Sequence, residues 1–350
     1  PAILPGASAL LAQWKRCLWG QTHRNALPVL SPFFLLQWEE TMETLTSAEL
    51  HCHRTMNPCP VYDQENKTVF LFFNCVKKCV TENCQKCSGS LTDLTEEVIG
   101  DDVRNWATFA VGPGHGVQLK SGRLVLPAYA YHIIVPCSCC FLLWCCSPVP
   151  HSLIFYSTDD KREKWQKSEL MQGMATLECQ VAEVTSQEGD TVLYCNTRTT
   201  SPFRAEAFSK KEELNFEIPY WCKELRETRT GCQGSVVSFL STSRSPGVNV
   251  NDTPSNLLFS HPTGNERKDL GIYRNLSPLE EGKWEGPCLL YNGPSGYSDL
   301  AVCQGPPLLF GCLFECGKVH PYEEIAFQLF NEQKLQSTPA EQIREQRGAS

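Results

Sequence analysis

The hydrophobic positions of this chain are spaced as in many short strands, and long helical periodicity is scarce. Short runs rich in β-branched and aromatic residues recur along the chain and are bounded by Gly, Pro, Asn and Asp. Such runs, separated by turn residues, are typical of a β-sandwich, barrel or propeller. The predicted strands are 68–73, 116–119, 123–127, 152–156, 191–195, 234–239, 256–260 and 308–314. The pattern therefore predicts an all-β fold.

Local repeats refine this prediction. Residues 120–123 (Lys-Ser-Gly-Arg) separate two apolar runs, which indicates a β-hairpin. Thr158 and Ser209 each stand seven residues before an aromatic residue, Trp165 and Phe216 respectively. A turn motif that repeats after strand-like runs favours a propeller among the all-β folds.

A long stretch without charged residues raises the question of a membrane span. No Asp, Glu, Lys or Arg occurs between Leu124 and Thr158, but prolines interrupt the stretch. The uninterrupted piece, 137–147, is shorter than the ~20 residues that a spanning helix needs. We therefore interpret it as a buried strand or as a loop that lies at a membrane surface. Its cysteines beside Phe141 and Trp144 are open to two interpretations, S-acylation at a bilayer or burial as free thiols. They are Cys137, Cys139, Cys140, Cys145 and Cys146.

Composition and charge exclude some classes of function. The 31 Lys and Arg against 39 Asp and Glu give a formal net charge of −8 over 350 residues, which argues against a nucleic-acid partner. No signal peptide is recognisable and several of the 20 cysteines are adjacent, so we expect a reducing setting with mostly free thiols. A metal protein is a further alternative, because pairs of cysteines stand at 75, 79, 84 and 87. Their spacing is too short for the usual zinc ribbon, so we expect no metal and no cofactor.

A few polar residues lie within or beside apolar runs. Glu178 shares one face of its predicted strand with Gln180, Arg198 follows the run 191–195, and Arg267 and Tyr297 each adjoin a later run. A buried arginine requires an acidic partner, which either the protein or a ligand supplies. Considered one at a time, each of these residues could equally be a charged residue at the surface or part of an internal ion pair.

Longer motifs carry a resemblance to a known family. The segments 53–60, 106–115, 127–131, 177–184, 231–235, 296–300 and 310–315 resemble the vertebrate sialidases. The segments 93–100, 116–125 and 314–317 are most similar to the membrane-associated ganglioside sialidase. The resemblance extends from about residue 36 to about residue 330.

The resemblance implies a six-bladed β-propeller with its active site at the central opening. We expect an altered or incomplete N-terminal blade with an unaligned segment at 1–35, the propeller at 36–330 and a polar tail at 331–350. Helical patterns are confined to 91–98 and to this tail. The implied activity is exo-α-sialidase, a glycoside hydrolase that removes terminal sialic acid from gangliosides, glycoproteins and oligosaccharides.

The resemblance also implies catalytic roles. Tyr297 matches the family's nucleophile, and Glu178 matches the general base that takes its proton. Sialidases with a Tyr nucleophile are a known exception to the two-carboxylate scheme of glycosidases. The substrate's own carboxylate would repel a carboxylate nucleophile, whereas a phenol arrives neutral.

Further residues match the sugar-binding positions. Arg198 and Arg267 match the second and third arginines of the triad that holds the substrate carboxylate, and Glu315 matches the carboxylate that steers the first. The positions near the glycerol and N-acyl groups are Tyr129, Tyr131, Glu82 and Gln233. For the two tyrosines and Glu82, simple packing remains an alternative.

The sequence departs from the family in its N-terminal part and in its turns. The first arginine belongs to an Arg-Ile-Pro-Ala segment, of which 1–4 resembles the tail, so we expect that arginine upstream of Pro1. The catalytic acid of the family is an aspartate, and none precedes Asp63. The Asp-box turns at 158–165 and 209–216 have lost their glycine, which bears first on stability. Two interpretations therefore stay open, an active exo-α-sialidase or a catalytically impaired propeller that binds sialylated glycans.

We expect the protein at membranes and in the cytoplasm. The resemblance and the cysteine cluster predict peripheral association with the plasma membrane, with endosomal and lysosomal membranes as further sites.

Overall fold

The computed structural model describes residues 52–77, 93–133, 148–209, 214–240, 254–303 and 307–336. These residues form strands almost throughout, which confirms the all-β prediction. The strands are β1 His53–Asp63, β2 Thr68–Lys77, β3 Trp106–Val111, β4 Val117–Gln118, β5 Leu124–His132, β6 Val149–Ser157, β7 Trp165–Lys167, β8 Cys179–Thr185, β9 Thr191–Thr197, β10 Phe203–Phe208, β11 Tyr220–Arg226, β12 Ser235–Leu240, β13 Ser255–Pro262, β14 Lys268–Asn275, β15 Trp284–Cys303, β16 Leu309–Cys316 and β17 Glu324–Asn331. Each of the predicted strands overlaps one of them.

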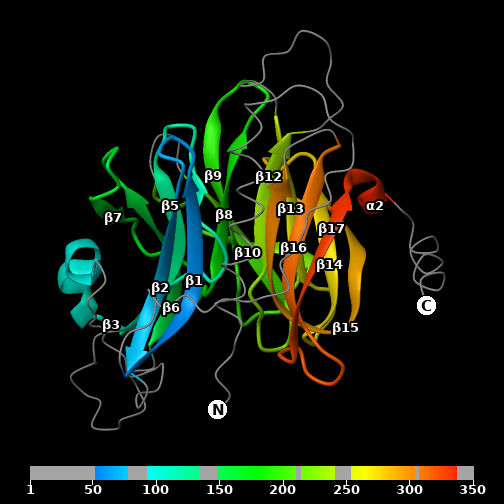
Figure 1. Ribbon diagram of the computed structural model, residues 1–350, viewed down its shortest axis with the longest axis horizontal. Coiled ribbons are helices and arrows are strands. Elements are labelled where there is room, and N and C mark those ends of the chain that lie inside the picture. The colour runs from blue at the N-terminus through cyan, green and yellow to red at the C-terminus, as the bar shows by residue number, and fades with distance from the viewer. Residues whose placement is uncertain are drawn as a thin grey trace.

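The strands pair as the antiparallel sheets of a propeller. Strands β1 and β2 form a hairpin, β3 to β7 form one sheet, β8 to β11 form a second, and β12 to β17 form a continuous third. In Figure 1, β1 to β7 lie on one side of the molecule and β12 to β17 on the other, with β8 to β10 between them. Sequential strands are neighbours almost throughout, as expected when each sheet is built from successive hairpins.

Strand β8 lies at the centre of the molecule. It contacts β5 of one sheet and β12 of another. Its side chains are buried on both faces, with Val181 and Val184 fully covered. Most of the strand is apolar, as burial on both faces requires, and Gln180 is a buried polar exception within it. Glu178 directly precedes this strand and is therefore carried to the centre of the sheets.

Strand β15 links two parts of the last sheet. Its first half pairs with β14 and its second half, from Ser295 to Cys303, pairs with β16. The register shifts between Ser295 and Ser298, and such a bulge re-aims the side chains around it. Tyr297 lies within this bulge.

The predicted hairpin at 120–123 is confirmed. Val117 pairs with Val125 across it, and Gly122 adopts a φ of +86°. A β-carbon on Gly122 would lie 2.9 Å from Glu65 Oε1, so both the backbone and the neighbouring side chain favour glycine there.

Where the structure describes the segments with helical patterns, it contains short helical elements. The segment near 91–98 contains the π-helical turn η3, Thr95–Ile99, followed by the 3₁₀ turn η4, Gly100–Arg104. At the C-terminal end, the helix α2 covers Glu332–Gln336. In the segment 95–104 only Ile99 is buried, so little packing supports a longer helix there.

The eroded Asp-box turn between β6 and β7 keeps an ordered geometry. Arg162 occupies the glycine position with a φ of +60°. Its carbonyl accepts a hydrogen bond of 3.0 Å from Trp165 Nε1, and its side chain pairs with Asp63 at 2.9 Å and with Glu65 at 3.0 Å. The ion pairs therefore offset the strain that a left-handed arginine introduces.

Several predicted features lie outside the described residues. These are the N-terminal segment 1–35, Glu82, the cysteine cluster 137–146, most of the cysteine pairs after Cys75 and most of the polar tail. No helix within the described ranges is long and apolar enough to cross a bilayer. The same ranges contain no group of three or more metal-ligating side chains.

Candidate active site

Tyr297 and Glu178 meet at the centre of the sheets. The Tyr297 hydroxyl donates a hydrogen bond of 2.5 Å to Glu178 Oε1, although 119 positions separate the two residues in the chain. Burial, together with the negative charge of Glu178, raises the pKa of Tyr297 well above its ordinary value of 10.0. The phenol is therefore neutral near pH 7, with its proton directed at a carboxylate oxygen.

Arg198 completes this group from the end of β9. Its Nη1 donates to Glu178 Oε2 at 2.5 Å and lies 3.3 Å from the Tyr297 hydroxyl. Backbone hydrogen bonds between Arg198 and the segment Leu177–Glu178 place the two side chains side by side. Burial opposes the charge on Arg198, but the neighbouring Glu178 outweighs this effect and raises the pKa of the guanidinium. Arg198 is therefore a permanent cation at the site.

Arg267 lies over the ring of Tyr297. It directly precedes β14, and its guanidinium carbon lies 5.1 Å from the centroid of the Tyr297 ring, within cation–π distance. Its Nη2 donates to the Gly231 carbonyl at 3.1 Å and its Nη1 to the Tyr322 hydroxyl at 3.2 Å. Two cations thus flank the phenol.

Glu315 and Gln233 hold the backbone around Tyr297. The Tyr297 amide donates to Glu315 Oε2 at 3.0 Å, and the Ser298 amide donates to Gln233 Oε1 at 3.0 Å. Gly296 allows this approach, since a β-carbon there would lie 2.4 Å from Glu315 Oε2. Burial raises the pKa of Glu315. These contacts fix the bulge that presents Tyr297.

A buried polar group supports the strand below Tyr297. Asp299 Oδ1 lies 2.7 Å from His115 Nδ1 and accepts a hydrogen bond of 2.9 Å from Ser235 Oγ. The same hydroxyl oxygen accepts from the Leu300 amide at 3.0 Å. Because β15 is tied here to β12 and to the segment after β3, the position of Tyr297 is set by three parts of the chain.

The predicted sugar-binding tyrosines lie on another strand. Tyr129 and Tyr131 stand on β5 with their ring centroids 6.2 Å apart. The Tyr129 hydroxyl accepts a hydrogen bond of 3.3 Å from Asn57 Nδ2 on β1. Their contact with a sugar stays a prediction, and Glu82 lies outside the described residues. The predicted residues that the described contacts bring together are Tyr297, Glu178, Arg198, Arg267, Glu315 and, through the Ser298 amide, Gln233.

The structure adds groups that the sequence analysis did not identify. The carbonyls of Thr230 and Gly231 hold the two arginines, and the Tyr322 hydroxyl meets Arg267. Backbone carbonyls carry no residue-type signal, and nothing in the pattern around Tyr322 distinguishes it. Arg204 on β10 could have been noticed in the sequence, because it lies within an otherwise apolar run. It is two residues from Glu206, so the two charged side chains share one face of the strand.

Taken together, the site has a neutral phenol, a carboxylate ready to accept its proton and two cations. Tyr297 is suited to nucleophilic attack on a centre that carries negative charge, since the phenol adds none before it reacts. The two guanidinium groups are suited to binding a planar carboxylate. An acidic substrate with an electrophilic carbon fits this geometry.

Comparisons with solved structures support the fold. The chain "Hadza microbial sialidase Hz136" superimposes with a TM-score of 0.59 at 21% identity, over 81% of this chain and 54% of the solved one. This chain therefore spans about half the length of that structure. The likeness identifies a sialidase-type β-propeller.

Comparisons with known sequences agree. A BNR repeat-like domain model matches residues 34–320. Sialidase-3 of Mus musculus is 45% identical over 348 residues, covering 86% of this chain and 82% of the relative. Sialidase-3 of Homo sapiens is also 45% identical, over 87% and 80% respectively, and Sialidase-2 of Mus musculus is 38% identical, over 84% and 79%. These matches show that the chain is a member of the sialidase family, the exo-α-sialidases among the glycoside hydrolases.

Proposed function

We propose that this exo-α-sialidase releases terminal sialic acid from gangliosides and other sialoglycoconjugates, with Tyr297 as nucleophile and retention of configuration. The observation that carries the proposal is the 2.5 Å hydrogen bond from the Tyr297 hydroxyl to Glu178, flanked by Arg198 and Arg267. The ganglioside preference rests on the resemblance described above.

In the proposed first step, the Tyr297 oxygen forms a bond to the anomeric carbon while its proton passes to Glu178. The bond from the anomeric carbon to the leaving oxygen breaks, and that oxygen takes a proton. In the second step the oxygen of water forms a bond to the anomeric carbon as the bond from that carbon to the Tyr297 oxygen breaks, and Glu178 returns its proton to the Tyr297 oxygen. The proton that water releases replaces the one taken up by the leaving oxygen in the first step. Two inversions at one carbon give net retention.

The two arginines would bind and orient the sugar carboxylate. Arg198 Nη2 donates to the Thr230 carbonyl, and the Arg198 side chain keeps 15% of its surface exposed. Because each terminal nitrogen of a guanidinium carries two N–H groups, the second N–H of Nη2 is available to a ligand oxygen. A charge-assisted bond to a carboxylate is among the strongest that a guanidinium makes.

The leaving oxygen needs an acid, which we assign to no residue of the described ranges. The family's aspartate would belong to the N-terminal part, where no Asp precedes Asp63. This observation favours the second candidate, a propeller that binds sialylated glycans with impaired turnover. Loss of a general acid typically removes about 10²–10⁴-fold in rate.

A Tyr297→Phe variant tests the central assignment. It should lose turnover of a fluorogenic sialoside, because the attacking oxygen is gone, while free sialic acid still binds through Arg198 and Arg267. The matched control is Tyr273→Phe, which removes a hydroxyl from another buried tyrosine and should leave turnover unchanged. Turnover that survives in Tyr297→Phe excludes Tyr297 as nucleophile, whereas binding without turnover in the parent chain supports the glycan-binding alternative.

We also propose peripheral membrane association, at the plasma membrane and on endosomal and lysosomal membranes besides the cytoplasm. The support is compositional, since five cysteines between 137 and 146 stand beside an apolar run. Changing these five cysteines to serine should shift the protein from the membrane to the soluble fraction on centrifugation. An unchanged membrane fraction would contradict S-acylation of this cluster.

A further inference from the structure

The loop between β11 and β12 contacts both carboxylate-binding arginines through its backbone. The Thr230 carbonyl accepts from Arg198 Nη2 at 2.8 Å, and the Gly231 carbonyl accepts from Arg267 Nη2 at 3.1 Å. Gly231 has a φ of +75°, and a β-carbon there would lie 2.4 Å from Arg198 Nε. The path of this loop therefore decides where both guanidinium groups lie.

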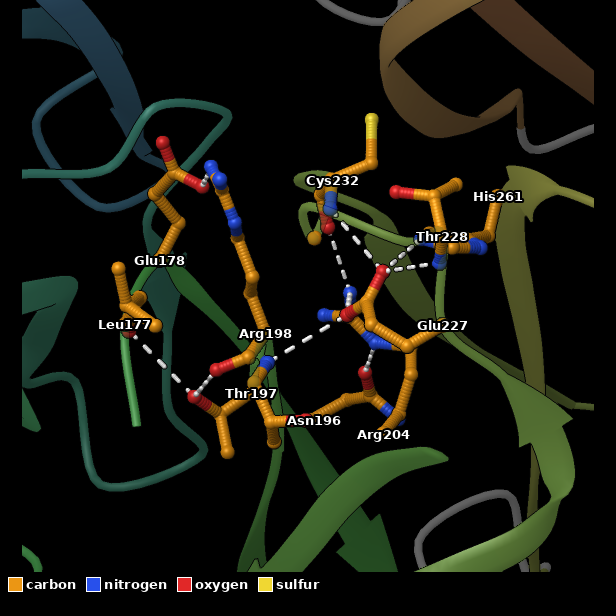
Figure 2. Close-up of polar contacts among 12 residues, drawn as sticks. Leu177, Glu178, Asn196, Thr197, Arg198, Arg204, Glu227, Thr228, Cys232 and His261 are labelled. Carbon is orange, nitrogen blue, oxygen red and sulfur yellow. Dashed lines mark hydrogen bonds and ion pairs between the residues drawn. The ribbon is translucent and has the colours of Figure 1, made fainter. Parts of the chain in front are cut away.

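Glu227 holds this loop at both ends. Its Oε1 accepts hydrogen bonds from the amides of Thr228 at 2.9 Å and Cys232 at 3.0 Å, so one carboxylate oxygen spans the loop (Figure 2). The other oxygen lies 3.4 Å from the amide of Thr199, the residue after Arg198. Glu227 thus ties the loop to the strand end that carries Arg198.

A buried cation pairs with this carboxylate. Arg204, which is fully buried, donates from Nη1 to Glu227 Oε2 at 2.9 Å and to the Cys232 carbonyl at 2.7 Å. Asn196 Oδ1 and the ring of Phe259 hold the rest of the guanidinium. Arg204 therefore binds both the loop, through the Cys232 carbonyl, and the Glu227 carboxylate that holds the loop, as Figure 2 shows.

His261 approaches Glu227 from β13. Its Nε2 lies 3.0 Å from Glu227 Oε1, and its Nδ1 lies 2.8 Å from the Pro262 carbonyl. Burial would raise the pKa of Glu227, but the neighbouring Arg204 guanidinium and His261 ring outweigh this effect and lower the pKa to about 2. The carboxylate is thus ionised near pH 7, and both oxygens act as acceptors.

We propose that Glu227 is a positioning residue for substrate carboxylate recognition, acting through the loop backbone on Arg198 and Arg267. The inference rests on the proposed function of these two arginines. Glu227 touches neither guanidinium directly, so its effect requires the Thr230 and Gly231 carbonyls.

The test compares Glu227→Gln with a matched control. The control is Asp63→Asn, which removes a charge from another buried carboxylate–arginine pair far along the chain from the site. Both variants should unfold at lower temperature than the parent. In Glu227→Gln, KM should rise with a smaller change in kcat, and kcat/KM should fall by about 10- to 100-fold because the binding geometry is displaced. Asp63→Asn should keep the parent's kcat/KM.

A second readout separates positioning from general damage. Free sialic acid and its methyl ester are titrated against each variant, since the ester lacks the carboxylate. Glu227→Gln should weaken binding of the acid and leave binding of the ester as in the parent, so the ratio of the two affinities falls. Asp63→Asn should keep the parent ratio. A parent-like ratio in Glu227→Gln, or equal loss of acid and ester binding, would overturn the proposal.

A milder variant decides the question where Glu227→Gln does not fold. His261→Gln removes the ring that lies 3.0 Å from Glu227 Oε1 and leaves Arg204 in place, so the affinity ratio should fall by about 2- to 10-fold, as for the loss of one polar contact to a charged group. An unchanged ratio would contradict the proposal. Different results reject the two proposals. If the parent chain does not bind sialic acid, the proposed function is rejected. If Glu227→Gln keeps the parent's ratio of acid to ester affinity, only the positioning role of Glu227 is rejected.

Discussion

The molecule pairs a buried arginine with a carboxylate at its centre, where Arg198 meets Glu178, and again in its β6–β7 turn, where Arg162 meets Asp63. The two arginines differ in how many of their nitrogens are hydrogen-bonded and in how exposed their side chains are. In the turn, Arg162 donates from Nε, Nη1 and Nη2 to Asp63, Asp159 and Glu65 respectively, and its side chain is 3% exposed. At the centre, Arg198 keeps a buried Nε without a partner in the described chain.

The difference separates a pair that stabilises the fold from one that can bind a ligand. Each nitrogen of Arg162 donates to an acceptor within the protein, so removal of Arg162 leaves the buried Asp63 carboxylate without its ion pair. Arg198 keeps 15% of its side-chain surface exposed, so a ligand carboxylate can reach its guanidinium, whereas its buried Nε lowers stability because it has no acceptor in the described chain. Both residues are arginines, but Arg162 stabilises the fold and Arg198 can bind a ligand, because their surroundings supply different hydrogen-bond partners.

The central pair should show the largest effect on catalysis. Glu178→Gln keeps the shape of the side chain but cannot accept the Tyr297 proton, so turnover of a sialoside should fall by about 10²–10⁴-fold. Steady-state kinetics measure this, with thermal unfolding as a check on folding. Near-parental turnover would show that another group takes the proton.

Breaking the Asp63–Arg162 pair of the β6–β7 turn should reduce stability and leave catalysis unchanged. Asp63→Asn places an amide against Arg162 and should lower the free energy of unfolding by about 3–5 kcal/mol, as for other broken buried pairs, with the specific activity of folded protein unchanged. Denaturant titration gives the value.

A matched variant of the same arginine sharpens this prediction. Glu65 also pairs with Arg162, but its side chain is 61% exposed, so Glu65→Gln should cost only about 0–1 kcal/mol. Equal losses in Asp63→Asn and Glu65→Gln would show that burial does not distinguish the two pairs.

Acid should reduce the contribution of the turn. Burial opposes ionisation of Asp63, yet hydrogen bonds from Arg162 and Asn66 lower its pKa from 3.8 to about 2. A lowered pKa stabilises the fold above the unfolded value and loses this effect as the pH falls toward the folded one. The difference in melting temperature between the parent and Asp63→Asn should therefore narrow between about pH 4 and pH 2. A difference that stays constant over this range would contradict the assignment.

The strands were predictable from the sequence because hydrophobic alternation and turn residues are local signals. Gly122, for example, ends a run where the hairpin requires a positive φ. The meeting of Tyr297 with Glu178 was predictable only through the resemblance, since 119 positions separate them and no local pattern specifies such a contact. The roles assigned to both residues remain predictions.

Other features could not be predicted, for physical reasons. The carbonyls of Thr230 and Gly231 depend on the path of a loop and not on its side chains. Loss of the Asp-box glycine suggested a weakened turn, but Arg162 finds Asp63 at a separation of 99 positions. Such compensation is visible only when both segments are placed in space.

The arginine in the β6–β7 turn also constrains how this sequence can change. Glycine at position 162 would relieve the positive φ but would leave the buried Asp63 carboxylate without the Nε donor. Replacing Asp63 alone would keep Arg162 in a left-handed conformation without its buried partner. Substitutions at the two positions should therefore be non-additive, because each residue offsets the cost of the other.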